Sequence, residues 1–502
     1  MAKKSVFLVL ISILLLLAFV ACENSVDDVF DPESPVTGVS LNRESTKIPT
    51  GSEKTLVATV FPVDVADKRV NWSSSNTSVA KVDASGKVTA VNPGSATITV
   101  KTVSGGKTAS CNVTVKANAR NIPLTLEFPE AGHVTLTKEG NPGTVLYSLD
   151  GGATKTAAPF DTEINVPADG RISFYRTLDN NLSQHNYFTI NCDEDCYVYG
   201  NVMSLIDSEN FATETEVFEC SFFELFYGNE FITSHPTKDL ILPAETLADH
   251  CYAYMFLGCT ALEDAPTILA TTLADDCCIS MFNDCSNLKM APDLLATTAV
   301  SYCFHYMFSD CTSLEEAPEL PATTLADSCY DSMFENCTSL KKAPALPATT
   351  MVEDCYLNMF AGCTSLTSAP ELPSTSLFYH CYYGMFDGCT SLKEAPILPA
   401  TTLAEGCYSE MFSGCTSLEE APILPATTLT EDCYAEMFSG CTSLSLITCL
   451  ATDISAQDCT YNWVENVAST GTFTKAPTAD WSGKADNDGI PSGWTVKDNP
   501  TT

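Results

Sequence analysis

The strongest constraint in this sequence of 502 residues is a 26-residue repeat that fills most of its C-terminal half. One cysteine recurs in steps of 26 at positions 251, 277, 303, 329, 355, 381, 407, 433 and 459, and a second at 259, 285, 311, 337, 363, 389, 415 and 441. The repeated unit is Cys-Tyr-x-x-Met-Phe-x-Gly-Cys-Thr-Ser-Leu-x-x-Ala-Pro-x-Leu-Pro-Ala-Thr-Thr-Leu-Ala-x-x. A fixed period without insertions predicts a solenoid in which each unit stacks on the last and buries the same positions.

Each unit divides into two segments of different character. Ser-Leu-x-x-Ala-Pro-x-Leu-Pro is short and carries prolines, such as Pro292 and Pro318, that would break a helix, so it predicts a strand and its exit. Thr-Thr-Leu-Ala-x-x-Cys-Tyr-x-x-Met-Phe has apolar residues at helical spacing behind a threonine suited to an N-cap, so it predicts a short α- or 3₁₀-helix. The sequence therefore predicts an α/β leucine-rich-repeat solenoid over residues 251–459.

The repeat resembles the BspA-like leucine-rich repeat, in the variant with paired cysteines. Phe-x-Gly-Cys-Thr-Ser-Leu carries this resemblance, which covers about residues 220–465. It implies a protein on the surface of a host-associated bacterium that adheres to matrix proteins, host cells or other bacteria. The ends of the array depart from the repeat, as capping turns must. We expect an N-terminal cap with a degenerate first repeat over 201–250, and a C-terminal cap over 460–502.

Two β-rich segments precede the repeat. Residues 36–117 alternate apolar and polar side chains, which predicts an all-β sandwich. This segment contains Val70-Asn71-Trp72-Ser73-Ser74-Ser75-Asn76 and Gly86-Lys87-Val88-Thr89-Ala90-Val91, and it resembles the bacterial immunoglobulin-like domain of group 2. That resemblance implies a surface stalk or a binding module. Residues 120–200 alternate in the same way between hairpin turns such as Asp150-Gly151-Gly152, and they predict a second β-sandwich.

The first 35 residues predict export and a lipid anchor. Residues 1–21 combine two lysines with a short apolar run, as a secretory signal peptide does. Phe19-Val20-Ala21-Cys22 resembles a bacterial lipobox, which implies lipid attachment to Cys22; plain secretion is the alternative. Residues 22–35 predict an acidic tether. We therefore expect a protein at the cell surface, anchored to the bacterial outer membrane through this lipid alone.

The cysteines allow two interpretations in the repeat. They form either a ladder of small buried thiols or disulfides, which export favours. Eight helical residues would separate the two cysteines of one unit by ~12 Å, well beyond the ~5.5 Å between the Cα atoms of a disulfide. Zinc is disfavoured because the spacing C-x2–4-C is absent from the repeat. Cys192 and Cys196 flank Asp193-Glu194-Asp195, where a local disulfide or free thiols are favoured over a metal site.

The charge of the chain restricts its partners. Sixty-three acidic residues stand against 25 basic ones, for a net charge of −38, which argues against nucleic acid and against anionic lipid headgroups. Residues 241–460 hold 29 acidic residues, four lysines and no arginine, so the repeat surface should meet basic patches on a partner. Varied acidic positions beside the predicted strand define a candidate acidic face, made of Glu263, Asp264, Asp293, Glu315, Glu316, Glu319, Glu371, Glu394, Glu419 and Glu420.

No pattern in the sequence predicts catalysis, a cofactor or a resident metal. HExxH, a P-loop and GxSxG are absent, and the six histidines are scattered. Asp486-Asn487-Asp488-Gly489 lacks the remaining ligands of a calcium loop and predicts a turn. We expect a non-catalytic surface lipoprotein whose solenoid binds a host matrix or cell-surface protein, or another bacterial surface. A structural cell-envelope component and a carbohydrate-binding lipoprotein are the alternatives.

Overall fold

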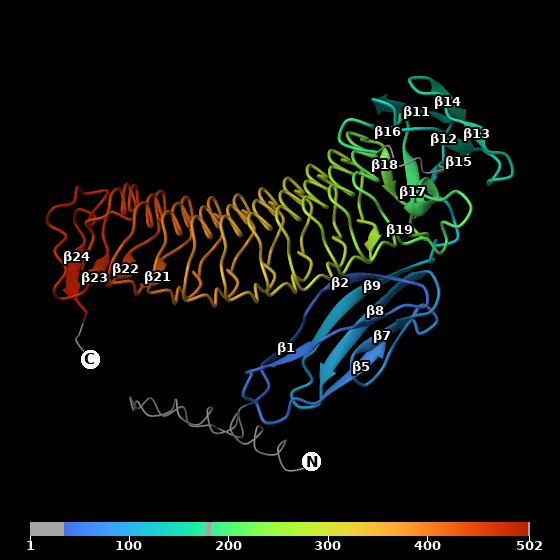
Figure 1. Cartoon of the computed structure of the whole chain (residues 1–502). Coiled ribbons are helices and arrows are strands. Elements are labelled where there is room, and N and C mark those ends of the chain that lie inside the picture. The colour runs from blue at the N-terminus through green and yellow to red at the C-terminus, as the bar shows by residue number, and fades with distance from the viewer. Residues whose placement is uncertain (1–34, 177–181, 500–502) are drawn as a thin grey trace, which may run out of the picture.

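The computed structural model describes residues 35–176 and 182–499. The predicted signal peptide, Cys22 and residues 22–34 of the tether lie outside these ranges. Figure 1 shows a long solenoid with one β domain at its N-terminal end and another β domain beside its first coils. We call the domain of residues 38–116 the first β domain and the domain of residues 125–201 the second β domain.

The first β domain is a sandwich of mostly antiparallel strands. One sheet has the order β2 (Ser45–Pro49), β9 (Thr108–Lys116), β8 (Gly94–Thr102) and β5 (Val70–Ser74), with β2 and β9 parallel. The remaining strands are β3 (Glu53–Thr55), β7 (Lys87–Ala90) and β6 (Ala80–Val82) in one sheet, and β1 (Gly38–Leu41) with β4 (Ala58–Phe61) in another. Alternation along β8 and β9 buries Ile98, Val100 and Val113 between the sheets, as a period of two requires.

The second β domain closes the N-terminal end of the solenoid. Its strands are β10 (Thr125–Phe128), β11 (Gly132–Glu139), β12 (Val145–Ser148), β13 (Thr156–Ala157), β14 (Glu163–Val166), β15 (Gly170–Arg176), β16 (Tyr187–Cys192) and β17 (Cys196–Asn201). β17 pairs in parallel with β18 (Ile232–Ser234) and β19 (Leu240–Leu242), and β19 pairs with β20 (Thr267–Ile268). A 3₁₀ turn, η1 (Val202–Leu205), follows β17. Sandwich and coils share one apolar core, in which Leu126 and Phe174 join Phe256.

The short α- or 3₁₀-helix predicted for each unit is wrong, because the described residues contain no α-helix and their one 3₁₀-helix, Val202–Leu205, precedes the repeats. The segment forms a run of turns whose backbone N–H groups alternate between two kinds of partner. Met255 donates to the carbonyl of Tyr252 within its own coil (3.3 Å), whereas Phe256 donates to the carbonyl of Met281 in the next coil (2.9 Å). We call this side of the solenoid the turn ladder: residues 250–259 and their equivalents in later coils. Half of its amides therefore join neighbouring coils, which an α-helix cannot do.

Left-handed residues explain why the turn ladder cannot be helical. Three positions, four residues apart, have positive φ: His250 (54°), Tyr254 (56°) and Gly258 (72°). The third position is Gly, Asp or Asn in each later coil, for example Asp284 (58°) and Asn336 (58°). These residue types tolerate the left-handed region best. A residue in that region every fourth position ends each turn before a second helical turn can form.

Prolines limit the backbone hydrogen bonding between coils on the opposite side of the solenoid, where strands are predicted. Pro292, Pro318 and their equivalents lack the N–H that a ladder needs, so the middle coils form isolated parallel bridges such as Glu316↔Lys342. Longer ladders are confined to the two ends of the array, where β19 has Leu240 and β22 (Leu446–Cys449) has Thr448 at the proline position, although β21 (Glu420–Leu424) keeps Pro422 there. At the C-terminal end, β21, β22, β23 (Thr472–Lys475) and β24 (Thr495–Asp498) form a parallel sheet.

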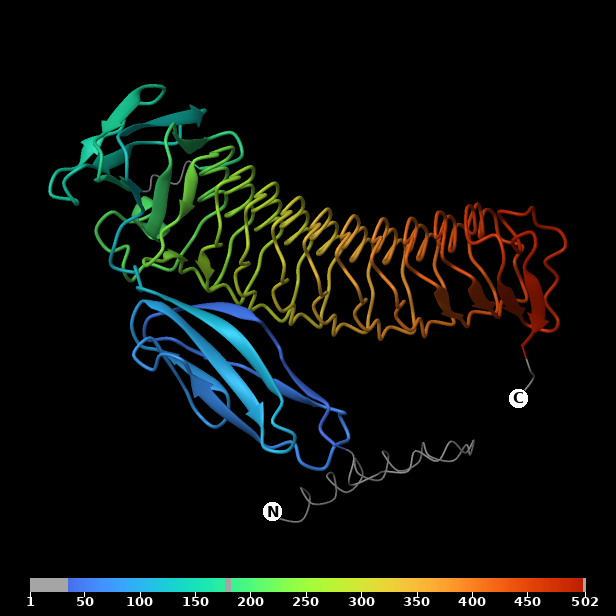
Figure 2. The same cartoon turned by 180° about the vertical axis from the view of Figure 1, so that it is seen from behind.

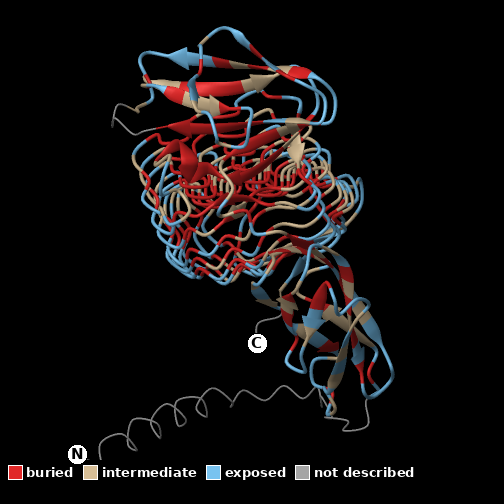
Figure 3. Cartoon of the chain, turned by 90° about the vertical axis from the view of Figure 1, so that its right-hand side faces the viewer, coloured by how far each residue is buried: buried red, intermediate tan, exposed pale blue. Residues whose placement is uncertain are grey.

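The core of the solenoid consists of side chains stacked coil upon coil. Met255 and Phe256 and their equivalents to Met437 and Phe438 are fully buried, as are Leu262 and its equivalents, while Leu273 is only partly buried. Neighbouring phenylalanine rings stack with centroids 5.6 Å apart between Phe282 and Phe308. Trp463, Trp481 and Trp494 cover the C-terminal end of this core. Figure 3 shows the buried residues gathered inside the coils and between the sheets of the second β domain.

Candidate binding face

The first β domain lies against the candidate acidic face. Views from the front and from behind show its strands along the first coils, on the side opposite the turn ladder (Figures 1 and 2). Four of its basic side chains make ion pairs there: Arg43, Lys47, Lys54 and Lys116. Four of the ten residues of this face, Asp264, Asp293, Glu316 and Glu319, are therefore engaged within the chain itself.

Asp293 is the centre of one group of ion pairs. Lys54 Nζ lies 2.6 Å from its Oδ2 and Arg43 Nη1 lies 3.1 Å from its Oδ1. Arg43 Nη2 also lies 3.2 Å from Glu319 Oε1. Although burial raises the pKa of Asp293, the charges of Lys54 and Arg43 lower it below its ordinary value.

Lys116 and Lys47 make the more deeply buried contacts. Lys116 Nζ lies 2.7 Å from Asp264 Oδ2, and its side chain is only 3% exposed. Lys47 Nζ lies 2.9 Å from Asp239 Oδ1 and donates to the carbonyl of Ala265 (2.5 Å). Asp239, which is 1% exposed, was not among the predicted residues because it precedes the regular repeat. Its signal in the sequence is an acidic residue beside the apolar run of 240–242.

Glu316 binds backbone rather than a side-chain charge. Its carboxylate accepts from the N–H groups of Glu44 (3.0 Å) and Ser45 (3.3 Å) at the start of β2. Burial raises the pKa of Glu316. The acidic face thus holds a β-strand by its free amides as well as by its lysines.

Two residues of the candidate acidic face, Glu263 and Glu315, form ion pairs with lysines of the repeat itself. Lys289 Nζ lies 2.7 Å from Glu263 Oε1, and Lys341 Nζ lies 2.5 Å from Glu315 Oε2, each lysine standing one coil further along. All four side chains are more than half exposed. Exposed pairs of this kind contribute little to stability, about 0–1 kcal/mol.

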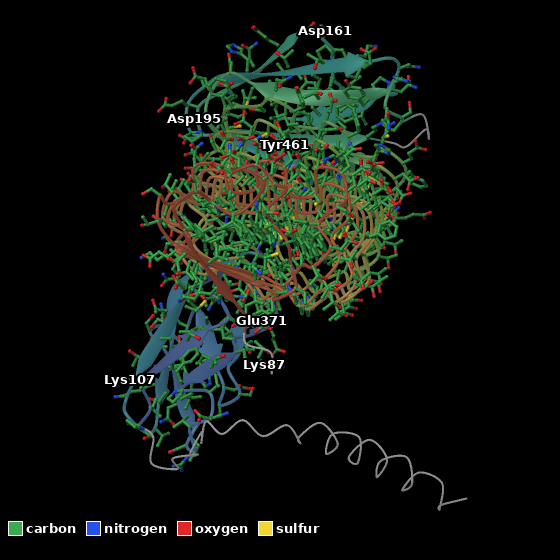
Figure 4. All side chains as sticks on the ribbon, turned by 90° about the vertical axis from the view of Figure 1, so that its left-hand side faces the viewer. Lys87, Lys107, Asp161, Asp195, Glu371 and Tyr461 are labelled. Carbon is green, nitrogen blue, oxygen red and sulfur yellow. The ribbon has the colours of Figure 1, made fainter. Side chains whose placement is uncertain are left out.

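The remaining four residues form the free half of the face. Glu371, Glu394, Glu419 and Glu420 are exposed, and none contacts a cation among the described residues. Glu394 and Glu420 occupy the repeat position of Asp264 and Glu316, so they continue the same row. Figure 4 shows Glu371 at the margin of the solenoid on the side of the first β domain.

Two exposed isoleucines stand within the free half. Ile397 is 82% exposed and Ile423 is 62% exposed. They occupy the repeat position that holds Asp293 and Glu319 in the coils that contact the first β domain. They place apolar area beside the carboxylates of Glu394 and Glu420.

The cysteines of the repeat are buried free thiols. From Cys285 to Cys441, the second cysteine of each coil donates to a phenylalanine carbonyl 29 residues earlier, as Cys311 does to Phe282 (3.1 Å). Burial raises the pKa of Cys337 and its neighbours well above the ordinary thiol value. Within residues 35–176 and 182–499, no group of three or more His, Cys, Asp or Glu is arranged to hold a metal.

Two family models match the chain. That of the bacterial Ig-like domain (group 2) matches residues 35–113, and that of the BspA type leucine rich repeat region matches 231–367 and 327–467, with six copies. Fold and matches together define a nearly all-β repeat protein, and the two matched modules are of non-catalytic kinds. The chain contains a bacterial Ig-like domain of group 2 followed by BspA type leucine-rich repeats, so both predicted resemblances are confirmed.

Several curated proteins share a short segment with the chain. An uncharacterized protein of Clostridium acetobutylicum is 44% identical over 90 residues, 18% of this chain and 23% of that protein. An alpha-L-arabinofuranosidase of Bifidobacterium longum is 44% identical over 113 residues, 21% of this chain and 10% of the enzyme. An Ig-like virion protein of Serratia phage KSP90 is 42% identical over 81 residues, 16% of this chain and 31% of that protein. The chain spans only 9% to 31% of the length of its curated relatives.

Within residues 35–176 and 182–499, no helix is long and apolar enough to cross a bilayer.

Proposed function

We propose that this protein is a non-catalytic surface lipoprotein whose acidic solenoid face binds basic protein surfaces, and that it acts in adhesion. The observation that carries the proposal is the engagement of that face by the chain's own Ig-like domain. Carboxylates of the solenoid bind four basic side chains and the backbone N–H groups at the start of β2; they belong to Asp239, Asp264, Asp293, Glu316 and Glu319.

The free half of the face is the proposed site for an external partner. Glu394 and Glu420 repeat the positions that hold the Ig-like domain, and Ile397 and Ile423 add apolar area between them. The partner we infer is a host matrix or cell-surface protein, or another bacterial surface, that presents lysines and arginines beside apolar side chains. Such charge complementarity sets the rate and specificity of association.

A charge-reversal experiment tests this function. The full chain is incubated with matrix proteins, glycans and whole cells, and bound protein is measured at low and at physiological salt. The variant Glu394→Lys/Glu420→Lys should lose most of the binding, whereas Glu405→Lys/Glu431→Lys should keep it. The control makes the same change of charge in the same two coils, on exposed residues of the turn-ladder side. Equal binding by both variants would reject the acidic face as the site.

Carbohydrate binding is a second candidate. A cleft of about 490 Å³ between the second β domain and the first coils is lined by Tyr197, Phe231 and Glu263, among others. Aromatic rings beside carboxylates suit a sugar, and several relatives are named as glycosidases. Loss of glycan binding in Tyr197→Ala, with protein binding unchanged, would favour this candidate. A structural role in the envelope is favoured if neither ligand class binds.

The proposed location rests on the sequence alone. Lipid attachment at Cys22 would place the tether of residues 22–35 between the outer membrane and the Ig-like domain. Labelling with a fatty-acid analogue should mark the wild-type protein and not Cys22→Ala. Protease added to intact cells should remove the protein if it faces outward.

A further inference from the structure

Two cysteines outside the repeat are placed unlike those within it. Cys192 ends β16 and Cys196 begins β17, and their sulfur atoms lie 3.4 Å apart. In the repeat, the second thiol of each coil instead donates to a backbone carbonyl, as Cys337 does to Phe308 (3.1 Å). The sulfurs of Cys192 and Cys196 face each other across a three-residue turn, Asp193-Glu194-Asp195.

Accessibility separates Cys192 from the ladder as well. Cys192 is partly exposed, whereas the ladder cysteines are buried. Cys196 is itself buried but lies at the wall of the cleft beside Tyr197 and Phe231, so reagents in solvent reach this pair through Cys192. Figure 4 places Asp195, the residue before Cys196, at the surface of the second β domain.

The two sulfurs also differ in acidity. The hydrogen bond between the two sulfurs lowers the pKa of Cys192 and raises that of Cys196. The side-chain oxygen of Asn229 lies 3.2 Å from the Cys192 sulfur and fixes its position. The more exposed sulfur is therefore the better nucleophile, because the thiolate is the reactive form.

We propose that Cys192 and Cys196 form a reversible disulfide site that oxidises before any cysteine of the repeat. The oxidant is a small-molecule disulfide such as oxidised glutathione. Cys192 Sγ attacks one sulfur of the oxidant; the S–S bond of the oxidant breaks, and one thiol leaves with the proton of Cys192. Cys196 Sγ then attacks Cys192 Sγ in the mixed disulfide, and the second thiol leaves with the proton of Cys196. The two electrons given up by the cysteines end on the oxidant, which becomes two thiols.

The bond would join two sheets where the second β domain meets the solenoid. β16 belongs to the sheet β14-β11-β16, while β17 belongs to the sheet that continues into the first coils. Closing the sulfurs from 3.4 Å to the ~2.05 Å of a disulfide needs only a small movement. Oxidation would thus fix the wall of the cleft without altering the repeat.

Peptide mapping of the full chain tests the site. The native protein is equilibrated in glutathione buffers of increasing oxidised fraction, then denatured and alkylated. The peptide that contains both cysteines should lose two hydrogen masses and both alkyl groups at the lowest oxidised fraction, while the ladder peptides remain fully alkylated. Reductant should restore the two alkyl groups. Full alkylation of Cys192 and Cys196 at every ratio, or earlier oxidation in the ladder, would overturn the proposal.

Two serine variants test the order of attack. Cys196→Ser should trap glutathione as a stable mixed disulfide on Cys192, because the resolving thiol is gone. Cys192→Ser should leave Cys196 unmodified, and Cys111→Ser, a buried cysteine of the Ig-like domain, should oxidise like the wild type. Glutathione on Cys196 rather than on Cys192 would contradict the assigned roles.

Discussion

Asp264 and Asp293 show how single carboxylates hold two domains together. Each meets a lysine of the Ig-like domain whose side chain is largely buried, Lys116 at 2.7 Å and Lys54 at 2.6 Å. A buried pair gains little over an apolar contact, but removal of one partner leaves an uncompensated charge that costs about 3–5 kcal/mol. These contacts therefore specify where the domain docks more than they add net stability.

As the pH falls, the docking of the Ig-like domain on the solenoid should first strengthen slightly and then be lost. Glu316, whose pKa burial raises, favours docking as it takes up a proton. Asp293 acts in the opposite sense, because the neighbouring charges of Lys54 and Arg43 lower its pKa. Its contribution to the stability of docking is complete above the ordinary aspartate pKa of about 3.9. That contribution is lost as the pH falls through the lowered pKa of the docked state. Small-angle scattering in low salt should show the domain leaving the coils below about pH 4. Asp293→Asn should be expanded already at neutral pH, and equal compactness of both chains throughout would contradict this account.

Stacked phenylalanines carry much of the solenoid's stability. Phe308 lies between Phe282 and Phe334, with both centroids 5.6 Å away, and is fully buried. Phe308→Ala should lower the free energy of unfolding by about 3–5 kcal/mol. Phe378→Ala removes the same side chain from a position 52% exposed, so it should change stability by no more than about 0.5 kcal/mol. Denaturant titration of both variants checks the contrast.

The turn ladder sets the shape of the array at the scale of one element. An α-helix is about 10 Å wide, whereas paired strands lie about 4.8 Å apart, so helices on one side would bend a stack of coils. Here the rings on the turn side repeat every 5.4–5.8 Å, close to the spacing of the strand side. The solenoid accordingly runs nearly straight (Figure 1).

Replacing Gly440 by alanine should change the stability in opposite directions in a turn ladder and in a helix. Its φ is 73°, and an added Cβ would meet Gly414 at an ordinary 3.5 Å, so Gly440→Ala should destabilise through φ alone, by about 1–2 kcal/mol. In a helix interior the same change would stabilise by about 1 kcal/mol. Gly440→Asn should lose less than Gly440→Ala, because Asn tolerates the left-handed region. Stabilisation by alanine in thermal unfolding would contradict the turn ladder.

The period predicted the buried stripes but not the backbone of the turn side. Apolar residues at spacings of three and four fit a helix and a succession of turns equally well, because both bring those side chains to one face. The signal that separates them is the recurring Gly, Asp or Asn at Gly258, Asp284 and Asn336, which favours positive φ. The acidic face was predictable from charge, whereas its partial occupation by Arg43, Lys54 and Lys116 depends on how two distant domains meet.

The whole molecule is an acidic rod whose first coils are covered by its own Ig-like domain. The proposed basic partner would use repeat positions equivalent to those that hold the Ig-like domain, so the contacts of that domain show the chemistry that we propose for the free half. Raising salt should weaken both, because contacts between charges are screened over about 8 Å at physiological ionic strength.

Charge exchange across the domain interface tests the central claim most directly. Small-angle scattering is recorded for the wild type, for Lys54→Glu and for Lys54→Glu/Asp293→Lys, in low salt. The single reversal should repel the domain from the coils and lengthen the molecule, and the double reversal should restore the compact form, since Arg43 and Glu319 remain to pair with the exchanged charges. A single variant as compact as the wild type, or a double variant no more compact than the single, would show that the acidic face does not hold basic side chains as described.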